Sequence, residues 1–458
     1  MNDARPGTPW PVFFVASIAV FLVSIDTTVL FAAFGAMRAG FPDSTAADMS
    51  WVLNAYTIVY AALLVPAGKL SDTHGRRRIF LLGLMLFLLA SAGCGFATGV
   101  GVLVSARVLQ AVGAALLVPS SLALVLGAFS IERRAVAVSL WGAVGGLAAA
   151  LGPSVGAAMV ASLGWRWAFF INLPLGLVAW VYGRNRLTEW RNANMDTSFD
   201  LPGTALLMAG VGLLAFGIVQ SEALGWRSPA VVGLMFVGFC VLLGFVAWAR
   251  HTPHPALDLS LFADPTYRNV NIATLVFGIA FAMMFFGLFF FLMQIWHYSL
   301  PMAGLAVSPG PLLVVPVAII AGRRATRIGH RPLLVGGSVL YAAGGLWLYL
   351  LAGNVPNFLG IWLPAMVLTG TAVGMVLPSL SGAAVAQLAP ERFGIGSAVN
   401  QSVRQIGAVL GVSATVAFVG HNAPQLADFQ QLYLTHIGLA ILTALICLSV
   451  DTRTRIQN

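Results

Sequence analysis

The sequence predicts an all-α integral membrane protein with fourteen transmembrane helices. Of its 458 residues, 59% are apolar and only 9% are charged, and the mean hydropathy is +0.90, far from the values of a soluble domain. The apolar residues form fourteen runs of roughly 18 to 27 residues, each long enough to cross about 30 Å of hydrocarbon as a tilted helix. The runs centre near Leu22, Tyr60, Leu88, Ala114, Ala148, Gly176, Gly212, Phe239, Met283, Leu312, Tyr341, Val373, Ile406 and Leu442.

The distribution of basic residues predicts the orientation. Lys and Arg near the ends of spans stay in the cytoplasm, and placing the N-terminus inside puts nineteen of the 24 basic residues there. We therefore expect both termini to be cytoplasmic in a multi-pass protein of a bacterial plasma (inner) membrane. No small-residue cleavage site follows the first apolar run, so we expect that run to be retained as a span. The net charge of +9 follows from this bias, and with no soluble domain to carry it we expect no nucleic-acid partner.

A weak internal repeat predicts the domain organisation. Residues 68–76, between the second and third spans, are echoed by residues 322–331, between the tenth and eleventh. Repeats of this kind let secondary transporters build two half-bundles that rock about a central site. We expect an N-terminal six-helix bundle (1–190), two inserted helices (191–260) and a C-terminal six-helix bundle (261–458), working as a monomer.

Asp26 is the only carboxylate well inside a predicted span, in the first run at residues 13–30. An ionisable group in hydrocarbon is costly, which implies a task for it. We therefore expect Asp26 to carry a proton and to face the cavity between the half-bundles. Arg107, in the fourth span, either snorkels outward or pairs with Asp26 and tunes its protonation, and we favour the second role.

Several motifs resemble a known family. The stretch Gly68 to Arg78 resembles the G-x-L-a-D-r-x-G-r-r loop of the major facilitator superfamily. Residues 51–56, 164–174 and 199–203 resemble its fourteen-helix drug:proton antiporter branch, the EmrB/QacA type, and residues 24–29 resemble that branch's L-D-x-T-I-V signature. The resemblance covers nearly the whole chain. It implies the major facilitator fold and proton-coupled multidrug efflux by alternating access, with a role in antibiotic resistance and with the proton-linked carboxylate at Asp26.

The loop motif is expected to act as a cytoplasmic gate. Its residues of interest are Gly68, Asp72, Gly75, Arg76 and Arg77. Gly75 permits the backbone conformation of a tight turn, and Asp72 and Arg76 are spaced to pair with each other or with a neighbouring helix terminus. Such a charge cluster can hold an inner gate closed. The alternative for the arginines is that they only anchor the third span inside. Compared with the family pattern, Thr73 replaces an Arg, and the second copy of the loop lacks the Asp.

The fifth span resembles the antiporter motif G-P-x-x-G-G in residues 152–157, with Ala157 in place of the last Gly. Gly145, Gly152 and Gly156 would let a neighbouring helix approach closely, and Pro153 would permit a bend. We expect a bending, sliding interface. The alternative is close packing without a role in motion.

Substrate contact is expected from polar and aromatic side chains in several spans. The aromatic residues of the ninth span suit variable, lipophilic ligands, although a Phe-rich membrane helix is more often lipid-facing or packed. His297 is either a second titrating group or an interfacial histidine, and Arg404 is either a cavity residue or part of a polar packing face. The candidates are Asn54, Tyr56, Gln110, Phe281, Phe285, Gln294, His297, Asn400, Gln401 and Arg404.

The expected cargo is a lipophilic small molecule that is neutral, zwitterionic or monocationic, because one buried carboxylate opposes Arg107 and leaves no surplus of negative charge. No cofactor or metal is expected, since the three cysteines are far apart in sequence and the seven histidines are scattered. For the same reason we expect no enzymatic activity. An exporter of a dedicated metabolite or siderophore, or a lipid transporter, would share the same motifs.

Overall fold

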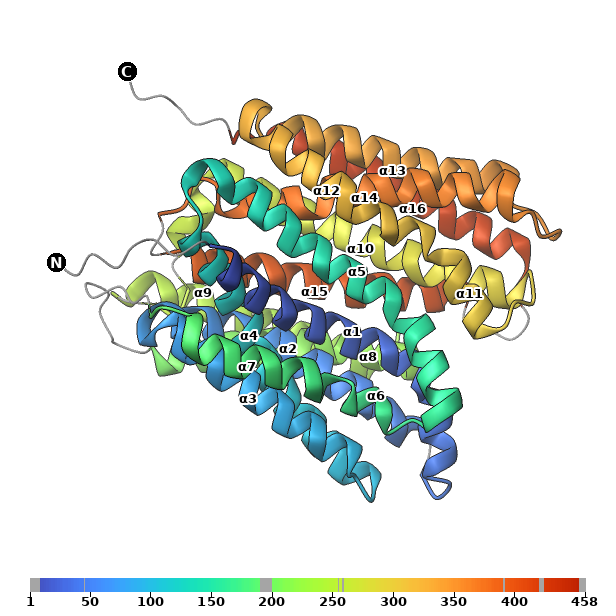
Figure 1. Ribbon diagram of the computed structural model, residues 1–458, viewed down its shortest axis with the longest axis horizontal. Coiled ribbons are helices and arrows are strands. Elements are labelled where there is room, and N and C mark those ends of the chain that lie inside the picture. Colours follow the sequence, from blue (N-terminus) through green and yellow to red (C-terminus); the bar gives the residue numbers. More distant parts are fainter. Residues whose placement is uncertain are drawn as a thin grey trace.

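A computed structural model describes residues 9–44, 46–189, 200–253, 255–257, 259–389, 392–419 and 424–452. Long helices run side by side along one axis of the molecule (Figure 1). Their bounds are α1 Trp10–Gly40, α2 Ala46–His74, α3 Arg76–Gly95, α4 Val100–Ala128, α5 Ile131–Leu163, α6 Trp167–Phe170, α7 Asn172–Arg186, α8 Leu201–Leu224, α9 Pro229–His251, η1 Leu259–Ala263, α10 Pro265–Gln294, α11 Leu300–Val307, α12 Pro309–Ile328, α13 Arg331–Leu351, η2 Phe358–Trp362, α14 Leu363–Val385, α15 Phe393–Val419 and α16 Leu426–Cys447.

Eleven stretches of the described residues are long and apolar enough to cross a membrane. The prediction of an all-α membrane fold is confirmed at this level. The other three expected spans, near residues 148, 176 and 406, fall on α5, α7 and α15, which are helices outside those eleven stretches. The count of fourteen spans therefore stays a prediction.

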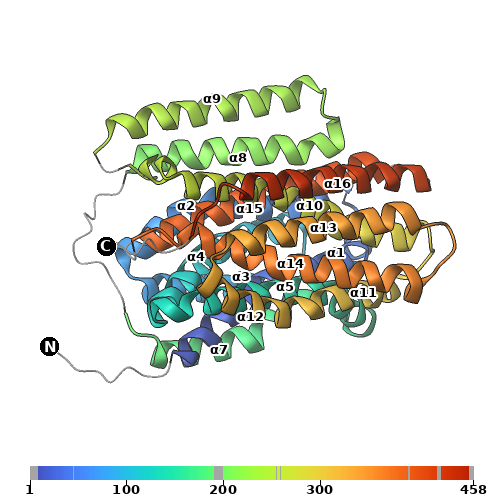
Figure 2. The same cartoon turned by 90° about the horizontal axis from the view of Figure 1, so that it is seen from above.

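Clusters of buried apolar residues mark two bundles and extend across the contact between them: one N-terminal cluster includes Val385 and Phe393, and the C-terminal cluster includes Ala143. The N-terminal bundle comprises α1 to α7, and its buried apolar residues form two clusters. The C-terminal bundle comprises α10 to α16 and has one large cluster, which includes Phe277, Phe291, Tyr341 and Trp362. Helices α8 and α9 form a hairpin outside both bundles (Figure 2). The expected division into bundle, insert and bundle, with its boundaries, stays a prediction.

Asp200 fixes the start of the inserted hairpin. Its carboxylate accepts hydrogen bonds from the backbone N–H of Gly203 at 2.9 Å and of Ala256 at 2.9 Å, and from Trp248 Nε1 at 3.0 Å. Burial raises the pKa of Asp200, but these three hydrogen bonds and the charge of Lys69 outweigh it and lower the pKa. Lys69 itself donates to the carbonyl of Pro255 at 2.9 Å. The hairpin is thus tied to the end of α2 that carries the loop motif.

The repeated loop motif marks equivalent contacts between the bundles. At Gly68 of α2, an added Cβ would lie 2.9 Å from the carbonyl oxygen of Gly394 on α15. At Gly322 of α12, an added Cβ would lie 2.9 Å from the Cα of Val136 on α5. Only glycine fits such close crossings. Each copy of the motif therefore places a glycine where a helix of one bundle crosses a helix of the other.

Helix α5 lies between α1 and the C-terminal bundle. On one side, an added Cβ at Gly145 would contact Val20, and at Gly156 it would lie 2.9 Å from the carbonyl oxygen of Val29, both on α1. On the other side, Gly142 faces Pro378 of α14. The antiporter-motif glycines thus make the α1 contact, and α5 connects α1 to the opposite bundle. The side chain of Pro153 lies outside the described residues, and the backbone of α5 is helical through it.

We expect Gly152→Ala to destabilise the protein. The new Cβ would lie 2.6 Å from the Cβ of Thr28 and 3.1 Å from the backbone nitrogen of Val29, and overpacking of this kind costs about 1 to 3 kcal/mol. Thermal unfolding in detergent should show a lower midpoint than wild type. Gly146→Ala on the same helix is the control, because its Cβ would lie 3.5 Å from Val314 Cγ1, an ordinary contact. Equal midpoints for the two variants would contradict the packing argument.

Candidate functional site

Asp26 is the centre of a buried polar cluster in the N-terminal bundle. Its side chain has no exposed surface. Arg107 Nη1 donates to Asp26 Oδ2 at 2.6 Å, while Gln110 Nε2 and Asn172 Nδ2 each donate to Oδ1 at 2.8 Å. A buried carboxylate is tolerated only when it is paired and hydrogen-bonded in this way. Arg107 thus lies where the sequence analysis expected a partner of Asp26; the proton-carrying role stays a prediction.

A second layer holds these donors in position. Ser91 Oγ on α3 accepts from Asn172 Nδ2 at 2.9 Å and from Gln110 Nε2 at 3.2 Å, and it donates to the carbonyl of Phe169 at 2.9 Å. Arg107 Nη1 also donates to Gln110 Oε1 at 2.6 Å, and its Nε donates to the carbonyl of Val52 at 3.0 Å. A network with this many shared partners fixes each side chain in one orientation. The site is therefore ordered before any substrate arrives.

The donors to Asp26 come from its own bundle. They lie on α4 and α7, and the expectation that the carboxylate faces the cavity between the half-bundles stays a prediction. Three hydrogen-bond donors of the N-terminal bundle converge on the one carboxylate. Sequence reasoning missed Asn172 and Ser91. Asn172 belongs to residues 164–174, which resemble the antiporter branch, and a polar residue at the start of an apolar helix was a sequence signal for a buried polar site. No sequence signal pointed to Ser91.

An aromatic stack leads from this cluster toward the C-terminal bundle. The Arg107 guanidinium lies 4.0 Å from the centre of the Tyr56 ring, a cation–π contact. The rings of Tyr56 and Tyr60 stack at 5.7 Å, and Tyr60 interacts electrostatically with Arg404 of α15. Ser402, also on α15, donates to the carbonyl of Ala61 on α2 at 3.1 Å. The stacked tyrosines of α2 thus run from Arg107 toward the contact of α2 with α15.

The loop motif joins the bundles at one end of the molecule, which we call the basic end: the end where α2 meets α3 and where α15 begins. Asp72 Oδ1 accepts from Arg76 Nη2 at 3.1 Å, and Asp72 Oδ2 accepts from the backbone N–H of Ile395 at 3.0 Å. Gly394, beside it, leaves room for the carboxylate. A negative charge at the first turn of α15 is favoured by the helix dipole. The motif acid therefore holds the start of a helix in the other bundle.

Other loop residues have different partners. Arg76 Nη1 donates to the carbonyl of Ala123 on α4 at 3.3 Å, which keeps that contact within the N-terminal bundle. Gly75 has φ +103°, a left-handed backbone that favours glycine. Arg77 Nη2 donates to the carbonyl of Arg184 at 2.7 Å, so it joins α3 to α7. Among the charged residues of the motif, Asp72 makes the hydrogen bond to the other bundle. The gating role of the motif stays a prediction.

The substrate candidates lie in several environments. Gln110 belongs to the Asp26 cluster, and Tyr56 lies beside it. Phe281 and Phe285 are half-buried and stack at 6.1 Å, while Gln294 and His297 are exposed at the end of α10, where His297 has φ +55°. The side chain of Asn54 lies outside the described residues. Their contacts with substrate stay predictions.

Three candidates lie on α15. Asn400 Nδ2 donates to Thr274 Oγ1 at 2.9 Å and to Asn271 Oδ1 at 3.2 Å on α10. Gln401 is 1% exposed, and neither its amide oxygen nor its amide nitrogen has a hydrogen-bond partner among the described residues. Arg404 is half-buried. A buried amide without partners is costly, so Gln401 has hydrogen-bonding capacity that no described residue satisfies. In the described part of the chain, no group of three or more His, Cys, Asp or Glu could hold a metal.

Comparison with known proteins shows the family. Two overlapping stretches, residues 16–412 and 270–457, match the Major Facilitator Superfamily, and the chain belongs to it. The chain is 34% identical to the puromycin resistance protein pur8 of Streptomyces alboniger, over 92% of this chain and 84% of that one. It is 31% identical to the cephamycin export protein CmcT of Amycolatopsis lactamdurans, over 92% and 87% of the two chains. The tetracenomycin C resistance and export protein of Streptomyces glaucescens is 30% identical, over 89% and 75%.

A solved structure has the same fold. The human organic anion transporter MFSD10 (TETRAN) matches with a TM-score of 0.69, covering 96% of this chain and 100% of that chain, at 18% sequence identity. The prediction of the major facilitator fold is confirmed. The chain is a multi-pass membrane transporter and not an enzyme, as the sequence predicted.

We expect Asp72→Asn to weaken the contact between the bundles at the basic end. The neutral amide loses the ion pair with Arg76 and the favourable charge at the start of α15, together about 1 to 2 kcal/mol. This corresponds to a change of about five- to thirty-fold in the ratio of closed to open forms. Spin labels at Asn185 and Thr326, in a cysteine-free background, should show a longer distance population by double electron–electron resonance.

Glu189→Gln is the control, because this acid also lies at the basic end but accepts from the backbone of Arg77 and Arg78 in its own bundle. An unchanged distance distribution in the Asp72 variant, or the same change in both variants, would contradict the assigned contact.

Proposed function

We propose that this transporter exports lipophilic small molecules or drugs from a bacterial cell in exchange for protons, as a member of the fourteen-helix drug:proton antiporter branch. One observation carries the proposal: a fully buried carboxylate, Asp26, is paired with Arg107 inside a membrane-spanning bundle. Ionisable pairs at such depth mark proton relays in transporters. Relatives named as resistance or export proteins favour efflux as the direction.

Protonation of Asp26 would change the cluster in a defined way. The carboxylate now accepts from three side chains. When it takes a proton it loses its charge, and the attraction to the Arg107 guanidinium falls with it. Arg107 is then free to strengthen its contact with Tyr56, 4.0 Å away. The stack of Tyr56 and Tyr60 would carry this change toward Arg404 and Gln401, where we propose that the substrate binds.

The same event would reach the other bundle through helix packing. Thr28 lies two residues beyond Asp26 on α1, and it lies against Gly152 of α5. Helix α5 in turn contacts α14 at Pro378 and α12 at Val314. A shift of α1 that follows protonation would therefore move the surface on which the C-terminal bundle rests. This is how we expect the glycines of the antiporter motif to act as a sliding interface.

The contact of Asp72 with α15 gives the transporter a closed state at the basic end. Breaking it would let that end open, as alternating access requires. The positive-inside bias places this end in the cytoplasm, so we propose that the structure represents a form closed toward the cytoplasm, with both chain termini on that side.

The proton gradient supplies enough free energy for this task. One elementary charge moving across 100 mV is worth about 2.3 kcal/mol, or roughly fifty-fold accumulation at 1.4 kcal/mol per decade. One proton at Asp26 is thus enough for export of a neutral compound by a monomer. No cofactor is required by this scheme.

An exporter of one dedicated metabolite is the second candidate. It is favoured by relatives that are named for a single compound, such as cephamycin or tetracenomycin C. Both candidates use the same site and the same coupling. Cells that make the protein would separate them: resistance to several unrelated compounds supports a multidrug exporter, and resistance to one compound class supports the dedicated exporter.

We expect Asp26→Asn to abolish gradient-driven transport while substrate binding remains. Asparagine is close in shape but cannot carry a proton, so the roughly fifty-fold accumulation that one charge can drive is lost. Transport is measured in vesicles with an imposed pH gradient, and binding by equilibrium dialysis. Asp43→Asn, the same change on an exposed residue outside the spans, should transport like wild type. Full uphill transport by the Asp26 variant would overturn the proposal.

The charge of the site predicts a preference among substrates. Asp26 is neutralised by Arg107, and Arg404 adds a second cation across the tyrosine stack. Dications should therefore be poor substrates compared with neutral, zwitterionic or monocationic compounds. Efflux of a monovalent dye and of a bisguanidine is compared in the same cells. Efficient proton-coupled export of the bisguanidine would refute the charge argument.

A further inference from the structure

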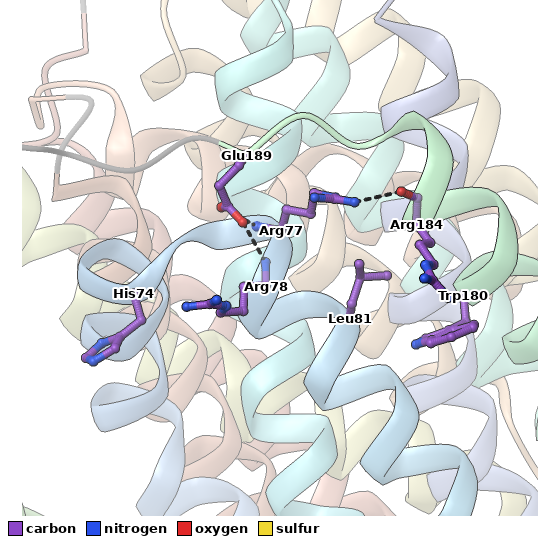
Figure 3. Close-up of a pocket in the computed structure, with 7 residues that line it drawn as sticks. All are labelled: His74, Arg77, Arg78, Leu81, Trp180, Arg184 and Glu189. Carbon is purple, nitrogen blue, oxygen red and sulfur yellow. Dashed lines mark hydrogen bonds between the residues drawn. The ribbon is translucent and has the colours of Figure 1, made fainter.

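A cavity of about 490 Å³ opens at the basic end between α3 and α7, away from the Asp26 cluster. Figure 3 shows the guanidinium of Arg77 directed toward Arg184 and that of Arg78 directed toward His74, with Leu81 and Trp180 on the lower side. The seven lining residues are His74, Arg77, Arg78, Leu81, Trp180, Arg184 and Glu189. Three arginines and one acid give this cavity a surplus of positive charge.

The cavity already holds one internal anion. Glu189 Oε1 accepts from the backbone N–H of Arg77 at 3.2 Å, and Glu189 Oε2 accepts from that of Arg78 at 3.2 Å. Its side chain is exposed, so an external group can reach the same place. Arg77 Nε is buried and has no hydrogen-bond partner among the described residues. Donors and charge in this cavity therefore exceed what Glu189 satisfies.

The two helices that form the walls of the cavity also carry exposed apolar side chains. Exposed apolar side chains lie on α3 and on α7, the two helices that form its walls: Leu82, Met85, Leu89, Leu177, Val178 and Val181. In a membrane transporter, exposed residues of this kind contact acyl chains. Trp180, at the border between the charged and the apolar parts, is a residue type that favours the headgroup level. The site thus combines a group of arginines with an adjacent apolar face on α3 and α7.

We propose that this cavity binds the headgroup of an anionic phospholipid of the cytoplasmic leaflet. The phosphate is held by Arg78 and Arg184 with Arg77 behind them, and the acyl chains lie along α3 and α7. Arginine suits phosphate because its planar fork donates two parallel hydrogen bonds. Basic pockets between helices on the cytoplasmic side are suited to such headgroups. Glu189 competes with the phosphate for the start of α3.

A free phosphate ion would find the same arginines, but not the apolar face. The two ligands share their anion chemistry and differ in the acyl chains, so they are distinguishable by experiment. Lipid binding does not depend on the proposed transport function, because it is measured on the purified protein without substrate or gradient; the assignment to the cytoplasmic leaflet rests on the orientation proposed above.

The test is native mass spectrometry of the full chain titrated with phosphatidylglycerol in detergent. Each arginine near a headgroup is worth about 1 kcal/mol, so we expect the Arg78→Gln, Arg184→Gln double variant to bind about ten- to thirty-fold more weakly. Glu189→Gln should bind more tightly than wild type, because a competing carboxylate is removed. Arg323→Gln, Arg324→Gln is the matched control: it removes two exposed arginines of α12 outside the cavity and should bind like wild type.

Three results would overturn the proposal. The first is equal binding by the Arg78 and Arg184 double variant and the α12 control. The second is equal affinity for phosphatidylcholine, which has no net charge. The third is that inorganic phosphate displaces the lipid at a concentration comparable to that of the lipid itself, which would assign the cavity to a free anion. Thermal unfolding of each variant without lipid shows whether a loss of binding reflects a loss of folding.

Discussion

The ion pair of Asp26 and Arg107 is the interaction on which the rest of the site depends. A carboxylate buried in a membrane-spanning bundle is costly unless a cation and hydrogen-bond donors surround it. This requirement explains why α3, α4 and α7 all direct polar side chains toward α1. In our proposal the arrangement responds to one proton, because neutralising the acid removes the reason for it. The buried pair is thus a constraint on packing and, in our proposal, the means of coupling.

Glycines determine how far the effect of this pair can extend. Helix α1 lies against α5 at Gly152 and Gly156, and α5 reaches the C-terminal bundle at Gly142. Close backbone approach without bulky side chains favours a surface along which helices can shift. At the basic end, Gly68 and Gly322 each allow a close crossing between helices of the two bundles. Only the first copy of the loop motif has an acid, Asp72, that accepts a hydrogen bond from the opposite bundle. The two halves are similar in packing and differ in electrostatics.

The inserted hairpin and the basic cavity lie on different sides of this machinery. Asp200 and Lys69 fasten α8 and α9 to the end of α2, beside the loop motif. The cavity of Arg77, Arg78 and Arg184 lies at the start of α3, immediately after that loop. Both features thus lie beside the same short stretch of chain, residues 68–78. The loop motif is therefore linked to the inserted hairpin through Lys69 and, by our inference, lies beside a lipid-binding cavity.

The sequence by itself determined the class of fold, because hydropathy and motif spacing are local properties, and it favoured a pairing of Asp26 with Arg107, because a buried charge is costly. It also indicated that Asp72 bonds near itself or to a helix terminus, without saying which. Only the tertiary structure decided that the terminus is that of α15, at Ile395, that Asn172 and Ser91 complete the Asp26 cluster, and that Gln110 belongs to it. These contacts join residues that are far apart in the chain. They depend on which helix faces pack together, and no local sequence pattern encodes that packing.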